Sequence, residues 1–392
     1  MRGLAATLLD PPPEMTPRRV LLTADAVGGV WTYVLDLAGG LAGRGVRTTL
    51  AVLGPAPSAA QLAAARAVPG LDVVALDHEL DWTAADASAI RAAGQAVAAL
   101  GRAVGADLIH LNSPALAAGV PFGAPVVAIC HSCVRTWWAA VRGGGPLPPD
   151  LAWRADLTAE GYAAADILVA PSRAFARATA AAYGLGREPT VVHNGRPPTA
   201  PGTSTPPHAV ALTAGRLWDE GKNVALLDAA AGRLGIPALA AGATEGPNGA
   251  RIALRHIRPL GQLDPPALAA RLAGRPIFVA PCFYEPFGLA VVEAAGHGCP
   301  LVLSDIPSFR ELWDGVATFV PVDDPGALAA AVEALAADPQ NAARAGAKAA
   351  ARAASYDVES MAAGTVGVYR AVLAGRHRSA SAPAARLRSA SA

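Results

Sequence analysis

Two glutamates bracket a glycine in the run EPFGLAVVE, which follows a short apolar segment in the second half of the chain. The backbone N–H groups of Phe287, Gly288 and Leu289 would lie free at the N-terminus of a helix, and such a terminus binds phosphate or pyrophosphate. Glu285 and Glu293 could accept hydrogen bonds from neutral hydroxyl groups. The run therefore suits a ligand that carries both a diphosphate and sugar hydroxyls.

The same two acids also have a structural interpretation. Glu285 could cap the helix and Glu293 could lie on its solvated face, because acids are common at helix N-termini. Their spacing does not decide between the two, since a straight helix does not stack positions eight apart as immediate neighbours.

The surrounding sequence predicts a strand, a loop, a helix and a second strand. Residues 278–280 and 301–303 are apolar runs typical of buried strands. Pro286 is predicted at the first position of the helix, where its missing N–H does no harm, and Pro300 stops the helix from continuing. The loop would thus lie at the carboxyl end of a strand, where open α/β sheets bind ligands.

The longer run EPFGLAVVEAAGHGCPLVLSD resembles the E-x7-E signature of retaining glycosyltransferases of family 4, which have the GT-B fold. The resemblance implies that Glu285 contacts the sugar of a nucleoside-diphosphate sugar donor and that Glu293 contacts its ribose. It also implies that the amides of residues 287–289 hold the diphosphate. The resemblance extends over residues 19–373 and is strongest in the second half.

Strands and helices alternate twice along the chain, which predicts an α/β protein with two doubly wound parallel-sheet domains. A stretch rich in Pro, Ser and Thr between them is typical of an interdomain linker. This is the GT-B plan, in which two Rossmann-like domains face a cleft. The predicted divisions are a disordered leader over 1–17, an acceptor domain over 18–195, the linker over 196–208, a donor domain over 209–354, a closing helix that crosses back over 355–374, and a disordered tail over 375–392.

In the first domain, Gly28 and Gly29 stand between a predicted strand and a predicted helix. A glycine pair alone is often only a turn, and the third glycine of a nicotinamide-type fingerprint is missing. His131 ends another predicted strand, where a lone histidine is more often a buried, hydrogen-bonded residue. The resemblance implies that the glycine pair faces the donor and that His131 lies beside the donor sugar, where a histidine can act near neutral pH.

Three tryptophans follow these loops closely, namely Trp31, Trp137 and Trp138, and Asp25 ends the first predicted strand. Aromatic faces suit the C–H surfaces of sugars, so these four residues are candidates for contacts to a carbohydrate-like acceptor. Core packing is an equal alternative for the tryptophans, since Trp buries well.

In the second domain, Arg216 and Lys222 lie in GRLWDEGKN, directly after a predicted strand. Arg offers phosphate oxygens a fork of donors and Lys offers a point charge. A solvated turn is the less favoured alternative. The run resembles the diphosphate site of the family, although this chain has EGK where the family often has EKG. Leu260 and Gly261 resemble the turn whose backbone meets the nucleobase.

The composition narrows the classes of partner that the chain is expected to bind. With 32 Lys and Arg against 31 Asp and Glu, the net charge of +1 gives no signal for nucleic-acid binding. Lys222 and Lys348 are the only lysines, so the usual polybasic membrane patch is missing. The longest weakly polar stretch, residues 114–130, contains three prolines, which disfavour a transmembrane segment. The leader has no secretory cleavage signal, and translation could begin at Met1 or Met15.

The four cysteines suggest neither a disulfide framework nor a zinc site. Cys130 and Cys133 form a C-x-x-C pair, but no second pair follows, which disfavours zinc or redox chemistry. A reducing, cytoplasmic location is therefore expected. The sequence has no D-x-D pair, and the resembling family generally needs no metal, so neither a metal nor a cofactor is expected.

The sequence thus predicts a retaining hexosyltransferase with a nucleotide-sugar donor and a small-molecule or glycan acceptor. His131 and Glu285 are its predicted catalytic residues. Two alternatives stay open, because a fold does not define a function. One is a nucleotide-sugar epimerase of the same fold, and the other is a non-catalytic nucleotide- or glycan-binding protein.

Overall fold

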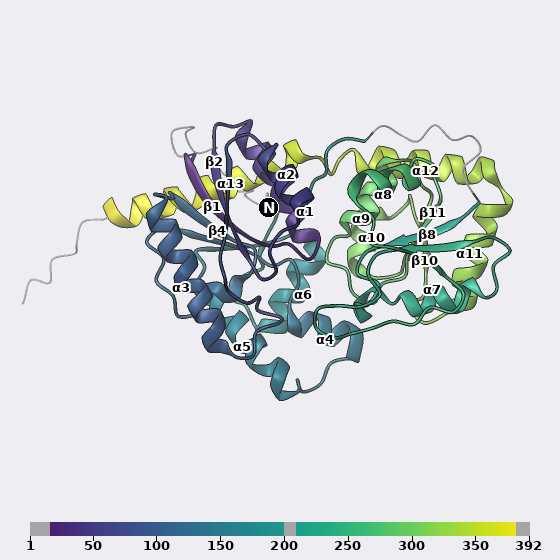
Figure 1. Cartoon of the computed structure of the whole chain (residues 1–392), viewed down its shortest axis with the longest axis horizontal. Helices are drawn as coiled ribbons and strands as arrows, with labels where there is room; N and C mark the ends of the chain where they lie inside the picture. Colours follow the sequence, from purple (N-terminus) through teal and green to yellow (C-terminus); the bar gives the residue numbers. More distant parts are fainter. Residues whose placement is uncertain (1–15, 200–208, 382–392) are drawn as a thin grey trace, which may run out of the picture.

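The computed structural model describes residues 16–199 and 209–381, which form two α/β domains side by side (Figure 1). The first sheet has the strand order β3-β2-β1-β4-β5-β6-β7 and the second β10-β9-β8-β11-β12-β13. Neighbouring strands run parallel in both sheets. The predicted fold of two doubly wound parallel sheets is confirmed.

The strand bounds follow the apolar runs of the sequence. The first sheet contains β1 (Arg19–Asp25), β2 (Arg47–Leu53), β3 (Leu71–Ala75), β4 (Leu108–Leu111), β5 (Val126–Ile129), β6 (Ile167–Ala170) and β7 (Thr190–Val191). The second contains β8 (Ala211–Ala214), β9 (Ala238–Ala241), β10 (Arg258–Gly261), β11 (Ile277–Ala280), β12 (Leu301–Ser304) and β13 (Thr318–Val320).

Helices connect the strands and cover both faces of each sheet. Those of the first domain are α1 (Gly29–Ala42), α2 (Ala59–Arg66), α3 (Ala87–Ala103), α4 (Val134–Arg142), α5 (Pro149–Ala164) and α6 (Arg173–Tyr183), with a 3₁₀ turn η2 (Pro114–Ala117). The second half has α7 (Val224–Ala231), α8 (Pro265–Leu272), α9 (Leu289–Gly296), α10 (Pro307–Trp313), α11 (Pro325–Ala337), α12 (Pro339–Ala353) and α13 (Val358–Ser381), with a turn η3 (Glu220–Lys222).

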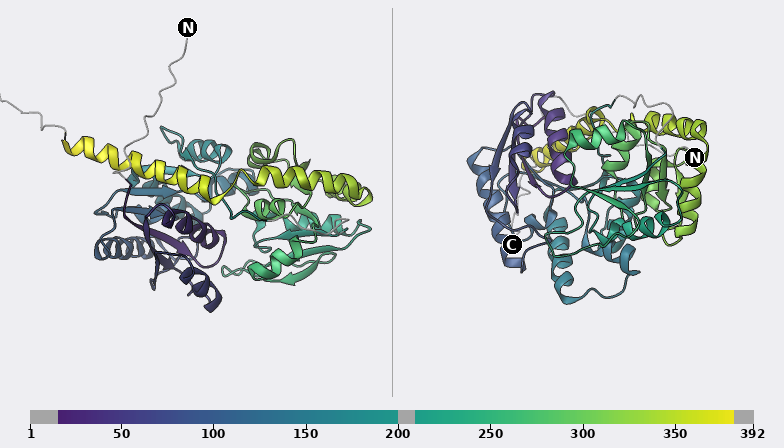
Figure 2. Two further views of the ribbon diagram at one scale, coloured as in Figure 1. Left: turned by 90° about the horizontal axis from the view of Figure 1, so that it is seen from above. Right: turned by 45° about the vertical axis from the view of Figure 1, so that its right-hand side comes forward.

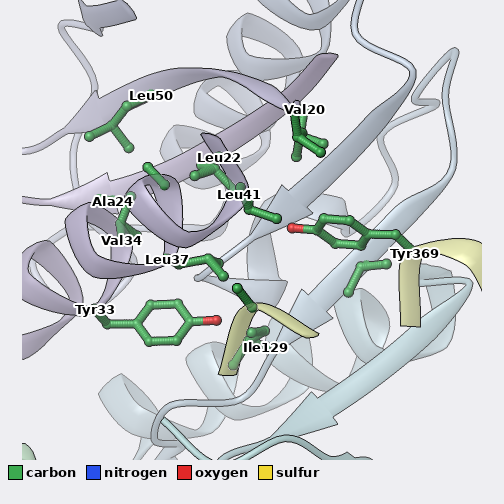
Figure 3. Close-up of a cluster of buried hydrophobic side chains, with 14 of the residues drawn as sticks. Val20, Leu22, Ala24, Tyr33, Val34, Leu37, Leu41, Leu50, Ile129 and Tyr369 are labelled. Carbon is green, nitrogen blue, oxygen red and sulfur yellow. The ribbon is translucent and has the colours of Figure 1, made fainter. Parts of the chain in front are cut away.

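The central strands are buried on both faces, which explains why they are continuous apolar runs rather than alternating ones. In β1, Val20 and Leu22 pack toward α1 and α13, whereas Leu21 packs toward α3 and α5. Figure 3 shows the first of these cores, in which Tyr33 of α1 and Tyr369 of α13 approach the same strands. The second sheet is divided in the same way, with α9, α10 and α12 on one face and α7 and α11 on the other.

The last helix returns from the second domain to the first. Helix α13 lies along the first domain, away from α11 and α12 (Figure 2). It packs on α1 so closely that a Cβ at Gly40 would lie 2.7 Å from the Cβ of Ala362. The helix begins at Val358 and continues to Ser381, beyond the end predicted at residue 374 and into the stretch predicted to be disordered.

The start of α9 differs from the sequence expectation. Pro286 is not the first residue of a helix, because α9 begins at Leu289 after Gly288, whose φ of 93° only glycine adopts readily.

Residues 1–15 of the leader, 200–208 of the linker and 382–392 of the tail lie outside the described residues. Within the described ranges, no helix combines the length and apolar character needed to cross a membrane.

Asp228 of α7 holds the turn that leads into β10. Its carboxylate accepts hydrogen bonds at 2.9–3.0 Å from the backbone N–H groups of Arg255, His256 and Ile257. Burial alone would raise the pKa of Asp228, but these hydrogen bonds outweigh it and hold the pKa below its usual value. The ionised carboxylate thereby fixes the start of the edge strand.

We predict that Asp228→Ala lowers the free energy of unfolding by about 2–4 kcal/mol at pH 7, because three backbone N–H groups, one of them buried, lose their acceptor. Since the folded-state pKa is depressed, the contribution is present above the unfolded pKa of about 3.9 and is lost as the pH falls through the folded value. Urea titrations at pH 7 and pH 3.5 measure this. Asp72→Ala, at an exposed position of β3, is the control. Equal midpoints for the two variants at pH 7 would refute the prediction.

Candidate active site

The predicted donor-site residues of both domains meet where the carboxyl ends of the two sheets approach each other. A Cβ placed on Gly28 would lie 3.4 Å from Nη1 of Arg216, and one on Gly29 would lie 3.6 Å from Cδ1 of Leu289. The loop after β1 therefore lies beside the loop after β8 and the first residue of α9. Both distances are ordinary van der Waals contacts, so a Cβ would fit at either glycine.

The loop between β11 and α9 presents the helix N-terminus to this region. Gly288 occupies the N-cap position of α9 without any side-chain hydrogen bond to the helix. The Phe287 N–H points to Oε1 of Glu285 at 3.4 Å. The Phe287 ring itself is buried and packs against His193 and Tyr356, so this residue supplies backbone to the site and side chain to the core.

Lys222 and Glu285 form an ion pair that the sequence analysis did not foresee. Both line a pocket at the ends of β8 and β11, together with Gly215, Arg216 and Cys282. Burial would lower the pKa of Lys222, but the adjacent Glu285 carboxylate and then Cys282 act in the opposite direction, and the net pKa is raised. Lys222 is therefore a permanent cation, held at the N-terminus of α9 by the acid predicted to contact the donor sugar.

Arg216 lies more openly at the mouth of the same pocket. Its guanidinium donates to Asp219 at 2.7 Å and stands 5.6 Å from the ring centroid of Trp218. Trp218 in turn stacks on Trp82 of the first domain, with ring centroids 6.4 Å apart and planes inclined by 24°. An aromatic contact between the domains thus stands beside this cation, and the sequence analysis assigned no role to either of these tryptophans.

His131 belongs to the first domain and follows the end of β5. Its Nε2 lies 2.7 Å from Oδ1 of Asn112, and the edge of its ring meets Tyr33 at a centroid distance of 4.6 Å. Burial lowers the pKa of His131 to about 4, so the imidazole is neutral at physiological pH. A neutral imidazole can accept one hydrogen bond and donate another.

Glu293, one turn into α9, belongs to a chain of charges that reaches the first domain. Its Oε1 lies 3.6 Å from Arg196, and Arg196 donates to Asp36 of α1 at 2.5 Å. Burial raises the pKa of Glu293, and the Arg196 guanidinium opposes the shift. Sequence analysis missed Arg196 because it opens the predicted linker, where a charged residue carries no signal.

The weaker candidates for acceptor contacts have different environments. Trp31 is 6% exposed and belongs to the core of the first domain, which favours the core-packing alternative for this residue. Trp137 is half-buried and faces the turn at Gly221, where a Cβ would lie 3.0 Å from its Nε1. Trp138 donates to the Gly144 carbonyl at 3.0 Å.

Asp25 and the predicted nucleobase turn have backbone roles. Asp25 accepts hydrogen bonds from the N–H groups of Val27 and Gly28 at 2.8 and 3.1 Å, so it shapes the glycine loop. Leu260 and Gly261 end the edge strand β10, two positions from β8 in the sheet, and the Gly261 carbonyl accepts from Gly242 at 2.8 Å.

The C-x-x-C pair has a packing role in the structure. Cys130 and Cys133 are free and buried, with hydrogen-bond contacts to Tyr162 at 2.6 Å and Thr136 at 2.8 Å, respectively. The Cys133 N–H donates to the hydroxyl of Tyr284, which lies next to Glu285. Over the residues that the structure describes, no group of three or more His, Cys, Asp or Glu side chains could hold a metal ion.

A second contact anchors the Glu285 loop to the first domain. Ser172, the N-cap of α6, donates its buried hydroxyl to the Pro286 carbonyl at 2.7 Å. Nearby, Glu311 of α10 accepts from the backbone N–H groups of Arg173 and Ala174 at the start of α6. The β11–α9 loop is therefore held by both domains.

Comparison with known proteins agrees with this architecture. Residues 27–199 match Glycosyltransferase Family 4, and residues 208–338 match Glycosyl transferases group 1. The chain is 38% identical over 120 residues to a phosphatidyl-myo-inositol mannosyltransferase of Mycolicibacterium smegmatis, which is 30% of this chain and 31% of that protein. It is 40% identical over 129 residues to a glycogen synthase of Mycobacterium tuberculosis, which is 32% of this chain and 31% of that protein.

Solved structures resemble the chain over nearly its whole length. Sucrose-phosphate synthase from Thermosynechococcus elongatus has a TM-score of 0.75 at 19% identity, with 91% of this chain and 100% of that chain covered. HepE from Anabaena in complex with UDP and glucose has a TM-score of 0.66 at 18% identity, with 89% and 98% covered. At these identities the likeness concerns the fold, whereas the segments that match the curated relatives span less than a third of those proteins.

The positions of the two cations predict a test of diphosphate binding. We expect Arg216→Ala and Lys222→Ala each to weaken nucleoside-diphosphate binding about tenfold to a hundredfold, the value of a charge-assisted hydrogen bond. Binding of the corresponding nucleoside should change much less. Isothermal titration calorimetry with both ligands measures the difference, and Lys348→Ala, at an exposed position of α12, serves as the control. Equal losses for nucleoside and nucleoside diphosphate would show that neither cation contacts the diphosphate.

Proposed function

Because the chain belongs to the family 4 glycosyltransferases with the GT-B fold, we propose that it transfers a hexose from a nucleoside-diphosphate sugar to a carbohydrate-like acceptor with retention at the anomeric carbon. The observation that carries the proposal is the convergence at one loop. Lys222, Glu285 and the N-terminus of α9 come together there, and Gly28 faces them from the other domain.

The departing diphosphate would be stabilised electrostatically. Lys222 and Arg216 supply positive charge, and the amides at the start of α9 supply oriented N–H donors with the positive end of the helix dipole. These groups are fixed before the reaction, so no reorganisation is needed when negative charge develops. We therefore propose that turnover requires neither a divalent metal nor a cofactor.

The remaining groups divide between the two sugars of the donor. Glu293 lies inside α9, beyond the amides of the helix terminus, and would accept hydrogen bonds from the ribose. Glu285 lies in the loop on the other side of those amides and would contact the hexose. The neutral imidazole of His131 would lie beside the hexose from the first domain.

We propose that the acceptor binds to the first domain. Trp137 is half-buried beside the Gly221 turn of the second domain, so its ring borders the region where the domains meet. Such a surface suits a small molecule or glycan. The free, buried thiols of all four cysteines fit a cytoplasmic location, where cysteines stay reduced.

The proposed function is tested by incubating the full chain, in the presence of EDTA, with a panel of nucleoside-diphosphate hexoses and candidate acceptors. We expect one donor to be consumed, with release of the nucleoside diphosphate and formation of a glycoside. Its anomeric configuration, read by proton NMR before mutarotation, should equal that of the donor. Inversion would contradict the retaining mechanism. Donor isomerised without an acceptor would indicate an epimerase, and binding without any turnover would indicate a non-catalytic protein.

Kinetics of two glutamate variants should separate the roles of the acids. Ribose is bound alike in the ground state and the transition state, so Glu293→Gln should raise the donor KM about tenfold with little change in kcat. The hexose changes charge and shape during transfer, so Glu285→Gln should lower kcat about tenfold to a hundredfold. Steady-state rates with donor varied at saturating acceptor decide this. Glu188→Gln, at an exposed position of the first domain, is the control, and the opposite pattern would reverse the two assignments.

A further inference from the structure

Three neighbouring strands of the first sheet carry polar residues at or near their carboxyl ends. β4 lies between β1 and β5 in the sheet, so Asn112 after β4 stands between Thr23 of β1 and His131 after β5. Asn112 is 9% exposed and Thr23 is 1% exposed. Buried polar side chains cost free energy unless they are hydrogen-bonded, so the partners of Asn112 show what it does.

The hydrogen bonds determine which way the Asn112 side chain points. Its backbone N–H donates to Oγ1 of Thr23 at 2.9 Å, which holds the two strand ends together. Its side-chain Nδ2 lies 2.6 Å from the backbone carbonyl oxygen of Thr23. A carbonyl oxygen can only accept, so the amide NH₂ group must face Thr23. The opposite orientation would place two acceptors in contact.

The orientation of Asn112 in turn fixes the proton of His131. The Oδ1 atom of Asn112 can only accept, and it lies 2.7 Å from Nε2 of His131. Nε2 must therefore carry a hydrogen. Because a neutral imidazole has a single N–H, the lone pair is on Nδ1.

We propose that Asn112 is a positioning residue that holds His131 as the Nε2-protonated tautomer, so that Nδ1 can accept a hydrogen bond from a hydroxyl of the sugar substrate. The substrate assignment rests on the proposed function, whereas the tautomer follows from the protein alone. In the opposite tautomer, Nδ1 would carry the hydrogen, so His131 would donate a hydrogen bond to a substrate oxygen instead of accepting one from a hydroxyl.

The groups that face His131 favour a neutral ring. Tyr33 contacts it from α1, and burial raises the pKa of Tyr33, so its phenol is uncharged. His110 of β4 lies nearby and also interacts with Asn112. Burial first and His131 second lower the pKa of His110 to about 3, and the hydrogen bond to Asn112 opposes this shift. The imidazoles of His110 and His131 are therefore both neutral above about pH 5. The position of the single proton on His131 is then set by its hydrogen bond to Asn112.

The first arm of the test observes the tautomer directly and needs no turnover. In the full chain labelled with ¹⁵N-histidine, two-bond ¹H–¹⁵N spectra between pH 6 and 8 should show a protonated Nε2 and an unprotonated Nδ1 for His131. The signals are assigned by their loss in His131→Gln. A protonated Nδ1, or an even mixture of tautomers, would overturn the proposal even if the enzyme is fully active.

The second arm uses two variants of Asn112. Asn112→Asp keeps an acceptor for Nε2–H, loses the donor to the Thr23 carbonyl and adds a negative charge, which raises the pKa of His131. As the pH falls through the raised value, Nδ1 becomes protonated and stops accepting, so kcat at pH 6 should fall at least fivefold relative to pH 8, unlike in the wild type. Asn112→Leu removes the acceptor and should lower kcat at least tenfold at both pH values, with nucleoside-diphosphate affinity kept within about twofold.

Asn341→Leu, at an exposed position of α12, is the control for the leucine substitution. Wild-type kcat and pH profile in both Asn112 variants would overturn the role of Asn112, whatever the spectrum of the wild type. If Asn112→Leu fails to fold, the aspartate variant and the wild-type spectrum still decide. A wild-type chain that shows the expected tautomer but transfers no sugar would count against the proposed function and not against the tautomer.

Discussion

The ion pair between Lys222 and Glu285 determines where the other groups of the site can lie. It joins the loops that leave β8 and β11, two strands that are neighbours in the second sheet. Both charges are largely shielded from solvent, so removal of either would leave the other uncompensated. The Glu285 loop is also held to the first domain through the Tyr284 hydroxyl and through Ser172. One loop thus carries the acid, the helix N-terminus and two hydrogen-bonded contacts to the first domain.

The charges of the site are separated in a way that suits sugar transfer. Cations and the helix terminus lie on the second-domain side, where negative charge would develop on a departing diphosphate. The first domain presents the neutral imidazole of His131 and the neutral amide of Asn112. Arg196 connects Glu293 of the second domain to Asp36 of the first through two ion pairs. The acid proposed to hold ribose is therefore linked to both domains.

Much of this arrangement could be predicted because it depends on local sequence. Apolar runs and helical periods indicated the two parallel sheets, and residues 278–303 indicated a strand, a loop, a helix and a second strand in the right order. The helix start was placed at Pro286 instead of Leu289, because the positive φ of Gly288 depends on how the loop packs. The end of α13 was placed too early, since the Ala- and Ser-rich segment near Ser381 resembles a disordered tail in composition.

Long-range partners could not be predicted in the same way. The pairing of Lys222 with Glu285, 63 residues apart, and the contact of Arg196 with Asp36 exist only because distant segments meet. Asn112 gave no signal, since a single asparagine after a strand is ordinary in a loop, and its role appears only when β1, β4 and β5 are placed side by side.

The most direct test of the central claim is a crystal structure of the full chain with a bound nucleoside diphosphate. The account predicts that the diphosphate lies on the backbone amides at the start of α9, with Lys222 and Arg216 on its oxygens and Glu293 on the ribose hydroxyls. A diphosphate bound away from α9, or a nucleotide with its base in place of the diphosphate at this helix terminus, would contradict it.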